Sequence, residues 1–478
     1  MSILSRDVVI VGGGPAGMAA AWQLRDMDIA LLEENDALGG RLKSLQRGDY
    51  WLNLGGHLFP AEGSRVRRLI EDLGLETIEV PGSKTAMSFA GKVYTSRRAE
   101  SYPFTLPLSM GERVQLVKAG LTVRWKVMSW ISQSRLRPGE SETERRARVS
   151  RFETDRTFRD LLGPLPEPVD AIFRTAVRRA PGEIDELSAG AGILLFAGNW
   201  AGKASGSPVN LLGGSGRLGE AVRRRLGERV ILGAKVASVE PDGDRAVVHY
   251  HAVDGRLSIA ARRVIVATPA PVARTLVQGL PRDVEKSLES VTYGPFVCMA
   301  VLTNESGPMP WDDLYAILTP GMAFNMLFNH ANPLRGTPGR KSGGSLMCYA
   351  GAQPGREMLN LPDDEIERRF REDLYRVYPQ LTNLISETVV QKWRYGNCYH
   401  TPDTDFDAML SYSRQPANVI QFAGDYFAPL GGSIEDAAKS GIETARNVAT
   451  ALDAHGRSRS ATGQVAEPLN PLFQRPRE

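Results

Sequence analysis

The chain has 478 residues, of which 42% are hydrophobic, so it can bury a large core and we expect two domains. Its 58 Lys and Arg residues nearly balance its 55 Asp and Glu residues, which gives no argument for nucleic acid as a partner. The three cysteines and six histidines show neither metal-ligand spacing nor a disulfide framework, so we predict no metal site and a reducing compartment.

The first residues lead into a core strand without a basic, apolar, cleavable leader. No stretch approaches the roughly 18–20 apolar residues that a membrane-spanning helix needs. We therefore expect a cytoplasmic protein.

The first predicted element is a buried parallel strand, an apolar and β-branched run over residues 7–11. A turn with G-x-G-x-x-G spacing follows, and a helix is predicted over residues 16–27. The three glycines of the turn are Gly12, Gly14 and Gly17. The first permits the tight turn, the second lets a pyrophosphate approach the backbone, and the third lets the helix pack close to the strand. The N–H groups of the helix from Ala16 onward favour phosphate.

A second strand over residues 29–32 ends at Glu33 and Glu34, about twenty residues after the first glycine. A carboxylate there can accept hydrogen bonds from both ribose hydroxyls of an adenosine, and its charge disfavours a 2′-phosphate. Strand, turn, helix and acid in register therefore predict a dinucleotide site. The alternative is a glycine-rich turn that binds nothing.

Two more glycine pairs follow in loops, Gly39-Gly40 before Arg41 and Gly55-Gly56 before His57. They would let the backbone pass close to a flat ring system and give Arg41 a path to the pyrophosphate. This order of motifs resembles the flavoprotein superfamily of amine oxidases, protoporphyrinogen oxidases, phytoene desaturases and UDP-galactopyranose mutases. The resemblance implies FAD as cofactor. It also implies an α/β fold in which a Rossmann-like, glutathione-reductase-like FAD-binding domain carries an inserted, mixed α+β substrate domain.

The FAD-binding domain is predicted to be discontinuous, because glycine-rich and strand-like segments of its type recur later in the chain. Strands are expected over residues 230–239, 245–251 and 263–269, and the resemblance implies that the main chain of Val236 contacts the adenine. We predict an FAD-binding domain of residues 1–85, 206–275 and 396–453, a substrate domain of residues 86–205 and 276–395, and a poorly ordered tail over residues 454–478.

A long amphipathic stretch over residues 114–137 interleaves Trp125, Trp130 and other apolar residues with Lys and Arg. We expect a helix that covers the substrate cavity with its charges in water. The less favoured alternative is a basic helix that touches a membrane surface.

A second glycine-rich cluster lies near the end of the chain. A strand over residues 419–423 runs into Gly424-Asp425, and Gly432-Ser433 opens a helix over residues 434–448, with Ser433 as its N-cap. The resemblance implies that Asp425 hydrogen-bonds the ribityl chain or the pyrophosphate. The positive end of the helix dipole would stabilise reduced flavin at its pyrimidine edge. The alternative is a capped surface helix.

Two further positions bear on the type of reaction. In amine oxidases of this superfamily a strand lysine is held through water to flavin N5. Its match here falls on Val297 or Cys298. Cys398 and Tyr399 match a monoamine-oxidase pair in which the cysteine bonds the flavin and the tyrosine forms half of an aromatic cage. The other cage aromatic is replaced by Gly432-Ser433, in a pattern closer to the desaturases.

We therefore predict an FAD-dependent oxidoreductase that dehydrogenates a small organic molecule with an apolar body. C–C desaturation is the first choice and flavin amine oxidation of a C–N bond is the alternative. A redox-neutral isomerase or mutase and a non-catalytic lipid carrier are further alternatives. We expect noncovalent FAD and consider molecular oxygen as electron acceptor. The residues predicted beside the reacting atoms are Tyr399, Cys298 and His57.

Overall fold

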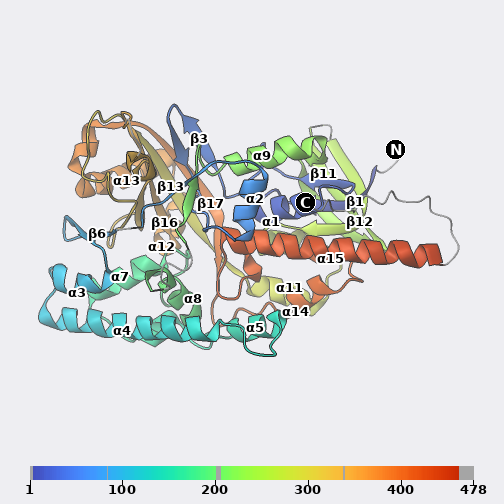
Figure 1. Ribbon diagram of the computed structural model, residues 1–478, viewed down its shortest axis with the longest axis horizontal. Helices are drawn as coiled ribbons and strands as arrows, with labels where there is room; N and C mark the ends of the chain where they lie inside the picture. The colour runs from blue at the N-terminus through green and yellow to red at the C-terminus, as the bar shows by residue number, and fades with distance from the viewer. Residues whose placement is uncertain (1–3, 83, 201–205, 254, 337–339, 462–478) are drawn as a thin grey trace, which may run out of the picture.

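The chain folds around two seven-stranded sheets, shown in Figure 1. The structure is a computed structural model that describes residues 4–82, 84–200, 206–253, 255–336 and 340–461. None of the helices within these ranges combines the length and the apolar character needed to cross a bilayer.

The first sheet has the order β10-β11-β12-β1-β2-β9, and β18 pairs with the end of β12. Strands β18, β12, β1, β2 and β9 are parallel to their neighbours, whereas β10, β11 and the start of β12 form an antiparallel meander. The strands are β1 (Leu4–Val11), β2 (Ile29–Leu32), β9 (Val230–Ile231), β10 (Lys235–Asp242), β11 (Arg245–Ala252), β12 (Gly255–Val266) and β18 (Ile420–Phe422).

Both faces of this parallel sheet are covered, which explains its continuous apolar strands. Side chains alternate between two cores: Val8 and Ile10 pack among the helices on one face, and Val9 and Val11 pack against the other. The first face is covered by α1 (Pro15–Gln23), α2 (Arg65–Asp72), α9 (Arg217–Leu226) and α15 (Ile434–Ala461). The second core includes α10 (Ala270–Leu276), α11 (Arg282–Ser290) and α14 (Asp407–Arg414).

Several element boundaries differ from the sequence prediction. The first helix ends at Gln23 rather than at residue 27, and the strand predicted over 230–239 is divided between β9 and β10. Helix α15 continues beyond residue 448 to Ala461, so the first part of the predicted tail is helical. Residues 462–478 lie outside the described residues.

The second sheet has the order β17-β13-β16-β15-β14-β6-β7. Its strands are β6 (Thr85–Phe89), β7 (Lys92–Ser96), β13 (Thr292–Thr303), β14 (Ala316–Leu318), β15 (Met326–Asn329), β16 (Gly344–Gly351) and β17 (Ile385–Tyr399). Two small sheets pair β3 (Ser44–Arg47) with β4 (Tyr50–Asn53) and β5 (Thr77–Glu79) with β8 (Val209–Leu211). The domain boundaries proposed above remain predictions.

A layer of helices lies along the second sheet, with the long α4 at its outer edge in Figure 1. A capping box begins α4: Ser109 Oγ accepts from the Glu112 N–H, and a Glu112 carboxylate oxygen accepts from the Ser109 N–H. The α-helices of the two segments between residues 102 and 194 and between 352 and 377 are α3 (Tyr102–Thr105), α4 (Met110–Gln133), α5 (Glu142–Val149), α6 (Phe158–Leu162), α7 (Glu167–Val177), α8 (Ala189–Leu194), α12 (Ala352–Met358) and α13 (Asp363–Val377).

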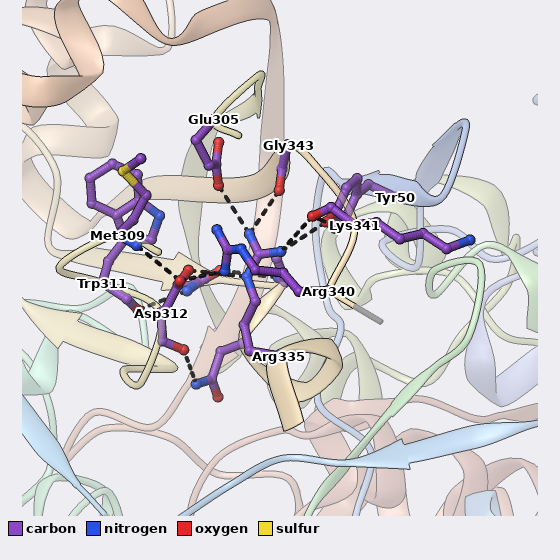
Figure 2. Close-up of polar contacts among 12 residues, drawn as sticks. Tyr50, Glu305, Met309, Trp311, Asp312, Arg335, Arg340, Lys341 and Gly343 are labelled. Atoms are coloured by element: carbon purple, nitrogen blue, oxygen red, sulfur yellow. Dashed lines mark hydrogen bonds and ion pairs between the residues drawn. The ribbon is translucent and has the colours of Figure 1, made fainter. Parts of the chain in front are cut away.

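A buried ion cluster ties the β3–β4 hairpin to the loops of the second sheet (Figure 2). Arg335 lies 3.0 Å from a carboxylate oxygen of Glu305 and 3.0 Å from one of Asp312, and its Nη1 donates to the Tyr50 hydroxyl at 2.8 Å. The Glu305 side chain is fully buried. No local sequence pattern predicted this cluster, because its members come from four separate segments.

Candidate functional site

Two adjoining cavities lie where the two sheets and the helical layer meet. The smaller, of about 300 Å³, is lined by Pro15, the Gly55-Gly56 loop, the end of β17 and the start of α15. We call it the cofactor cavity, because motifs predicted to hold the dinucleotide line it. The larger, of about 410 Å³, is bounded by α4, α7 and strands β6 and β14, and we call it the apolar cavity.

The glycine-rich turn has the geometry that dinucleotide binding requires. Gly12 has a φ of +102°, a conformation that side chains disfavour. A Cβ on Gly17 would lie 1.8 Å from the Gly12 carbonyl oxygen, so only glycine permits this contact between α1 and the turn. A Cβ on Gly14 would meet no protein atom within 4 Å. The backbone of Gly14 therefore borders open space that a pyrophosphate can occupy.

The two predicted acids have different environments. Glu33 is 6% exposed, and its carboxylate accepts from the Gly13 N–H at 2.7 Å and from the Asn35 N–H at 3.0 Å. Glu34 is exposed. The Ala234 N–H donates to the Glu33 carbonyl at 2.8 Å, which brings the start of β10 and Val236 to the same end of the sheet. Glu33 therefore lies beside the glycine-rich turn, and its contact with the ribose stays a prediction.

Arg41 and Asp425 meet in the cofactor cavity from opposite ends of the chain. Arg41 Nη2 lies 2.9 Å from an Asp425 carboxylate oxygen, and the Tyr293 hydroxyl donates to the other oxygen at 3.1 Å. Burial favours a lower pKa for Arg41, but Asp425, Tyr293 and Cys398 together outweigh it and leave the pKa of the guanidinium above its usual value. Arg41 is therefore a permanent cation in the cavity, and Gly40, with φ +53°, packs against Gly14 beside it.

The second glycine pair positions His57 at the cavity wall. A Cβ on Gly55 would lie 2.1 Å from the Arg41 carbonyl oxygen, and Gly56 also lines the cavity. His57 Nδ1 lies 3.0 Å from the Gly55 carbonyl oxygen, and the ring packs edge-on against Phe328. Burial lowers the pKa of His57 to about 4, so its imidazole is neutral near pH 7.

The start of α15 faces the cofactor cavity. Ser433 Oγ accepts from the Asp436 N–H at 3.2 Å, which confirms Ser433 as N-cap, and Ser433, Ile434 and Ala437 line the cavity. Gly432 is required here, because a Cβ would lie 2.7 Å from Cys398 Sγ. At the other glycine of the cluster, Gly424, a Cβ would meet the Tyr426 ring at 2.2 Å. A helix N-terminus, an arginine and open glycine backbone are donors that suit FAD, so the residues present fit this cofactor.

Comparison with known proteins agrees with this geometry. The sequence matches the family described as flavin containing amine oxidoreductase over residues 15–449. The chain belongs to this family. It is 24% identical to amine oxidase [flavin-containing] B of Rattus norvegicus and 25% identical to that of Homo sapiens, in each case over 93% of this chain and 86% of the relative. The protein is therefore an FAD-dependent oxidoreductase.

Solved structures of a putrescine oxidase and of a cyclohexylamine oxidase share the fold. A putrescine oxidase bound to putrescine aligns with a TM-score of 0.74 and 19% identity, over 94% of this chain and 100% of that one. Cyclohexylamine oxidase from Brevibacterium oxydans IH-35A aligns with a TM-score of 0.71 and 19% identity, over 94% and 99%. The comparisons thus favour the alternative of amine oxidation over the first choice of C–C desaturation.

Two residues match the position of the amine-oxidase lysine, and one of them faces the cofactor cavity. Cys298 lines the cofactor cavity, whereas Val297 is fully buried in the core beyond the strand. Burial raises the pKa of Cys298 to about 12, so the thiol stays protonated. Neither position supplies a cation.

The expectation that Tyr399 lines the reaction site is not met by the described cavities. Its hydroxyl donates to Glu186 at 2.9 Å and accepts from Arg356 at 3.1 Å, and its ring packs against Gly182. The reason is that β17 contributes Trp393, Gly396 and Asn397 to the cavity and then leaves it. Cys398 is fully buried behind Gly432 and does not itself line the cavity, and burial raises the pKa of its thiol well above the usual value.

Sequence reasoning missed most of the cavity wall. The aromatic residues of the wall come from four strands of the second sheet, β13, β15, β16 and β17, and their neighbours in the sequence form no motif. These residues are Phe296, Phe328, Tyr349 and Trp393. The wall also contains Arg179, which follows α7. Alternation along buried strands could have indicated which side chains share a face, but not which face borders a cavity.

Proposed function

We propose that this oxidoreductase is an amine oxidase that acts on the C–N bond of a small amine with an apolar body. The observation that carries the proposal is the apolar cavity adjoining the cofactor cavity. Its wall is rich in aliphatic and aromatic side chains from α4, α7 and the second sheet, among them Leu116, Ile172 and Phe173. The names of the relatives and of the structural neighbours support an amine as the reacting group.

In the proposed reaction the substrate carbon loses a hydride and its nitrogen loses a proton, and water hydrolyses the resulting imine to a carbonyl compound and ammonia. FAD, when bound, supplies the two-electron acceptor, and molecular oxygen would regenerate it with formation of hydrogen peroxide. Glu33, Arg41 and the start of α15 would hold the cofactor. The aromatic wall would exclude water from the reacting carbon.

No external general base is assigned. Among the described residues of the cofactor cavity, the one carboxylate is that of Asp425, and it is bound to Arg41. His57 is neutral, and its Nδ1 is directed to the Gly55 carbonyl. An amine that enters as the neutral base needs no group of the protein to remove a proton before hydride loss.

Anaerobic reduction of the bound flavin tests this proposal directly. Without oxygen, the purified holoenzyme is mixed with one compound at a time. The nitrogen compounds are cyclohexylamine, 2-phenylethylamine, octylamine and their carboxylated analogues. The other compounds are an activated cyclic ketone and a polyene. Amine oxidation predicts that at least one nitrogen compound bleaches the flavin and that the ketone and the polyene do not. Bleaching by the ketone or the polyene alone would return C–C desaturation to first place.

A further inference from the structure

Arg179 lines both cavities and is the residue that they share among those described. It lies two residues beyond the end of α7, deep in the protein, yet its surface stays partly accessible because it borders the two cavities. Its position marks the boundary between the cofactor cavity and the apolar cavity. A group bound to Arg179 would therefore lie between the reacting end and the apolar body of a substrate.

Two backbone carbonyls hold the Arg179 side chain in place. Its Nε donates to the Ala176 carbonyl at 2.9 Å, and its Nη2 donates to the Leu195 carbonyl at 2.5 Å. These contacts join the end of α7 to the turn after α8. They fix the guanidinium and leave Nη1 with no hydrogen bond to any described residue.

No carboxylate among the described residues lies within ion-pair distance of Arg179. The adjacent Arg178, by contrast, pairs with Glu183 at 2.9 Å. Arginine stays charged in proteins, and a buried charge is costly unless it is paired. Burial lowers the pKa of Arg179, and Tyr349 only partly opposes this effect. The fold therefore holds a cation deep inside without supplying its anion.

Neither cavity offers Arg179 a free carboxylate from a described residue, so a bound substrate would have to supply the anion. The cofactor cavity contains Asp425, which is already bound to Arg41. The one carboxylate among the described residues of the apolar cavity is Glu100, which accepts from the Trp200 indole N–H at 2.7 Å and lies 4.0 Å from Arg124. Arg41, the other arginine of the cofactor cavity, differs from Arg179 because it already has a carboxylate partner.

We propose that Arg179 binds a carboxylate of the substrate, so that the preferred substrates are amines that carry both an apolar body and a carboxylate. The planar guanidinium suits a carboxylate, which it can bind through two parallel hydrogen bonds. The apolar body would fill the cavity lined by Met87, Phe173 and Leu318. This inference rests on the proposed amine oxidation for the reaction but not for the binding of the anion.

The test uses substrate pairs that differ only by a carboxylate on the carbon that bears the amine: L-phenylalanine with 2-phenylethylamine, and L-2-aminononanoate with octylamine. In the wild-type holoenzyme we expect a higher kcat/KM for the carboxylated member of at least one pair. Arg179→Met should lower that value by about 10- to 100-fold, the effect of losing hydrogen bonds to a charged group. For the matched amine without a carboxylate, Arg179→Met should change kcat/KM less than about threefold. Arg174→Met, one turn earlier on α7 and partly exposed, is the matched control and should change neither.

A binding measurement separates this inference from the proposed reaction. Octanoate and phenylacetate cannot lose a hydride as amines, and we expect each to perturb the flavin spectrum of the wild type and to bind more weakly to Arg179→Lys and Arg179→Met. Carboxylate binding that depends on Arg179, without flavin reduction by any amine, would refute amine oxidation and support the carboxylate site. Equal losses for both members of each pair, a preference for the amines without a carboxylate, or carboxylate binding to Arg179→Met as tight as to the wild type would refute the site. Should Arg179→Met fail to fold, Arg179→Lys and the wild-type titrations decide the question.

Discussion

The two adjacent acids after β2 differ in burial, and only the first is proposed to contact the cofactor. Glu33 is buried beside the glycine-rich turn, whereas Glu34 is exposed. Glu33→Ala should weaken FAD binding by about 10- to 100-fold, because hydrogen bonds to a charged group contribute about 1.5–3 kcal/mol. Glu34→Ala, the matched control, should bind FAD as the wild type does. Titration of each apoprotein with FAD measures the affinity, and equal affinities for both variants would contradict the assignment of Glu33.

The thiol nearest the start of α15 bears on how the flavin is held. Cys398 is fully buried, and the raised pKa of its thiol disfavours the thiolate that would form a thioether. We therefore expect acid precipitation to release FAD into the supernatant and Cys398→Ala to retain its cofactor before precipitation. A precipitated protein heavier by the mass of one FAD would refute noncovalent binding.

At the scale of elements, the buried ion cluster of Figure 2 connects the β3–β4 hairpin to the second sheet. Arg335→Met would leave the fully buried Glu305 without its cation and should lower the free energy of unfolding by about 3–5 kcal/mol. Lys341→Met removes a neighbouring pair with Asp49 in which both side chains are more than half exposed, and it should cost less than about 1 kcal/mol. Chemical denaturation compares the two variants. Similar losses for both would show that the cluster does not stabilise this junction.

The elements nearest the cofactor could be predicted because their signals are local. The roles of Gly17 and Ser433 depend on residues a few positions away, so spacing alone identifies the turn and the N-cap. The wall of the site depends on contacts between distant segments: Phe328 reaches it from β15 and Trp393 from β17. No local pattern shows which face of a buried strand will border a cavity.

The position of Tyr399 outside the cavity lining has the same origin. Its place in the sequence matched that of a cavity residue, but the path of β17 after Asn397 decides what the side chain contacts. Arg179 shows the converse case. The sequence does not indicate that, of the adjacent Arg178 and Arg179, only Arg178 pairs with a carboxylate of a described residue. The predicted domain boundaries and the main-chain contact of Val236 with adenine remain predictions for the same reason.

For the whole molecule, three buried histidines predict a loss of stability in acid. Burial lowers the pKa of His57 and of His400 to about 4, and it lowers that of His330 well below the ordinary value of 6.5. Between pH 6.5 and 4 the unfolded chain binds more protons at these sites than the folded chain. The free energy of unfolding should therefore fall as the pH falls, by up to about 1.4 kcal/mol per pH unit for each histidine.

Urea denaturation at pH 7 and pH 5.5 measures this dependence. His400→Gln should show a smaller loss on acidification than the wild type, because one titrating group is gone from both states. His251→Gln, which alters an exposed residue on β11, is the control and should match the wild type. Equal pH dependence in all three proteins would contradict the role assigned to the buried imidazoles.

The products of a single turnover test the central claim, oxidation of a C–N bond, most directly. The holoenzyme is reduced without oxygen by a limiting amount of the best nitrogen compound from the panel, and the quenched mixture is analysed for carbonyl compound and ammonia. The account predicts one carbonyl compound and one ammonia for each flavin reduced. A product that keeps its nitrogen and has gained a C=C bond, with no ammonia released, would contradict it.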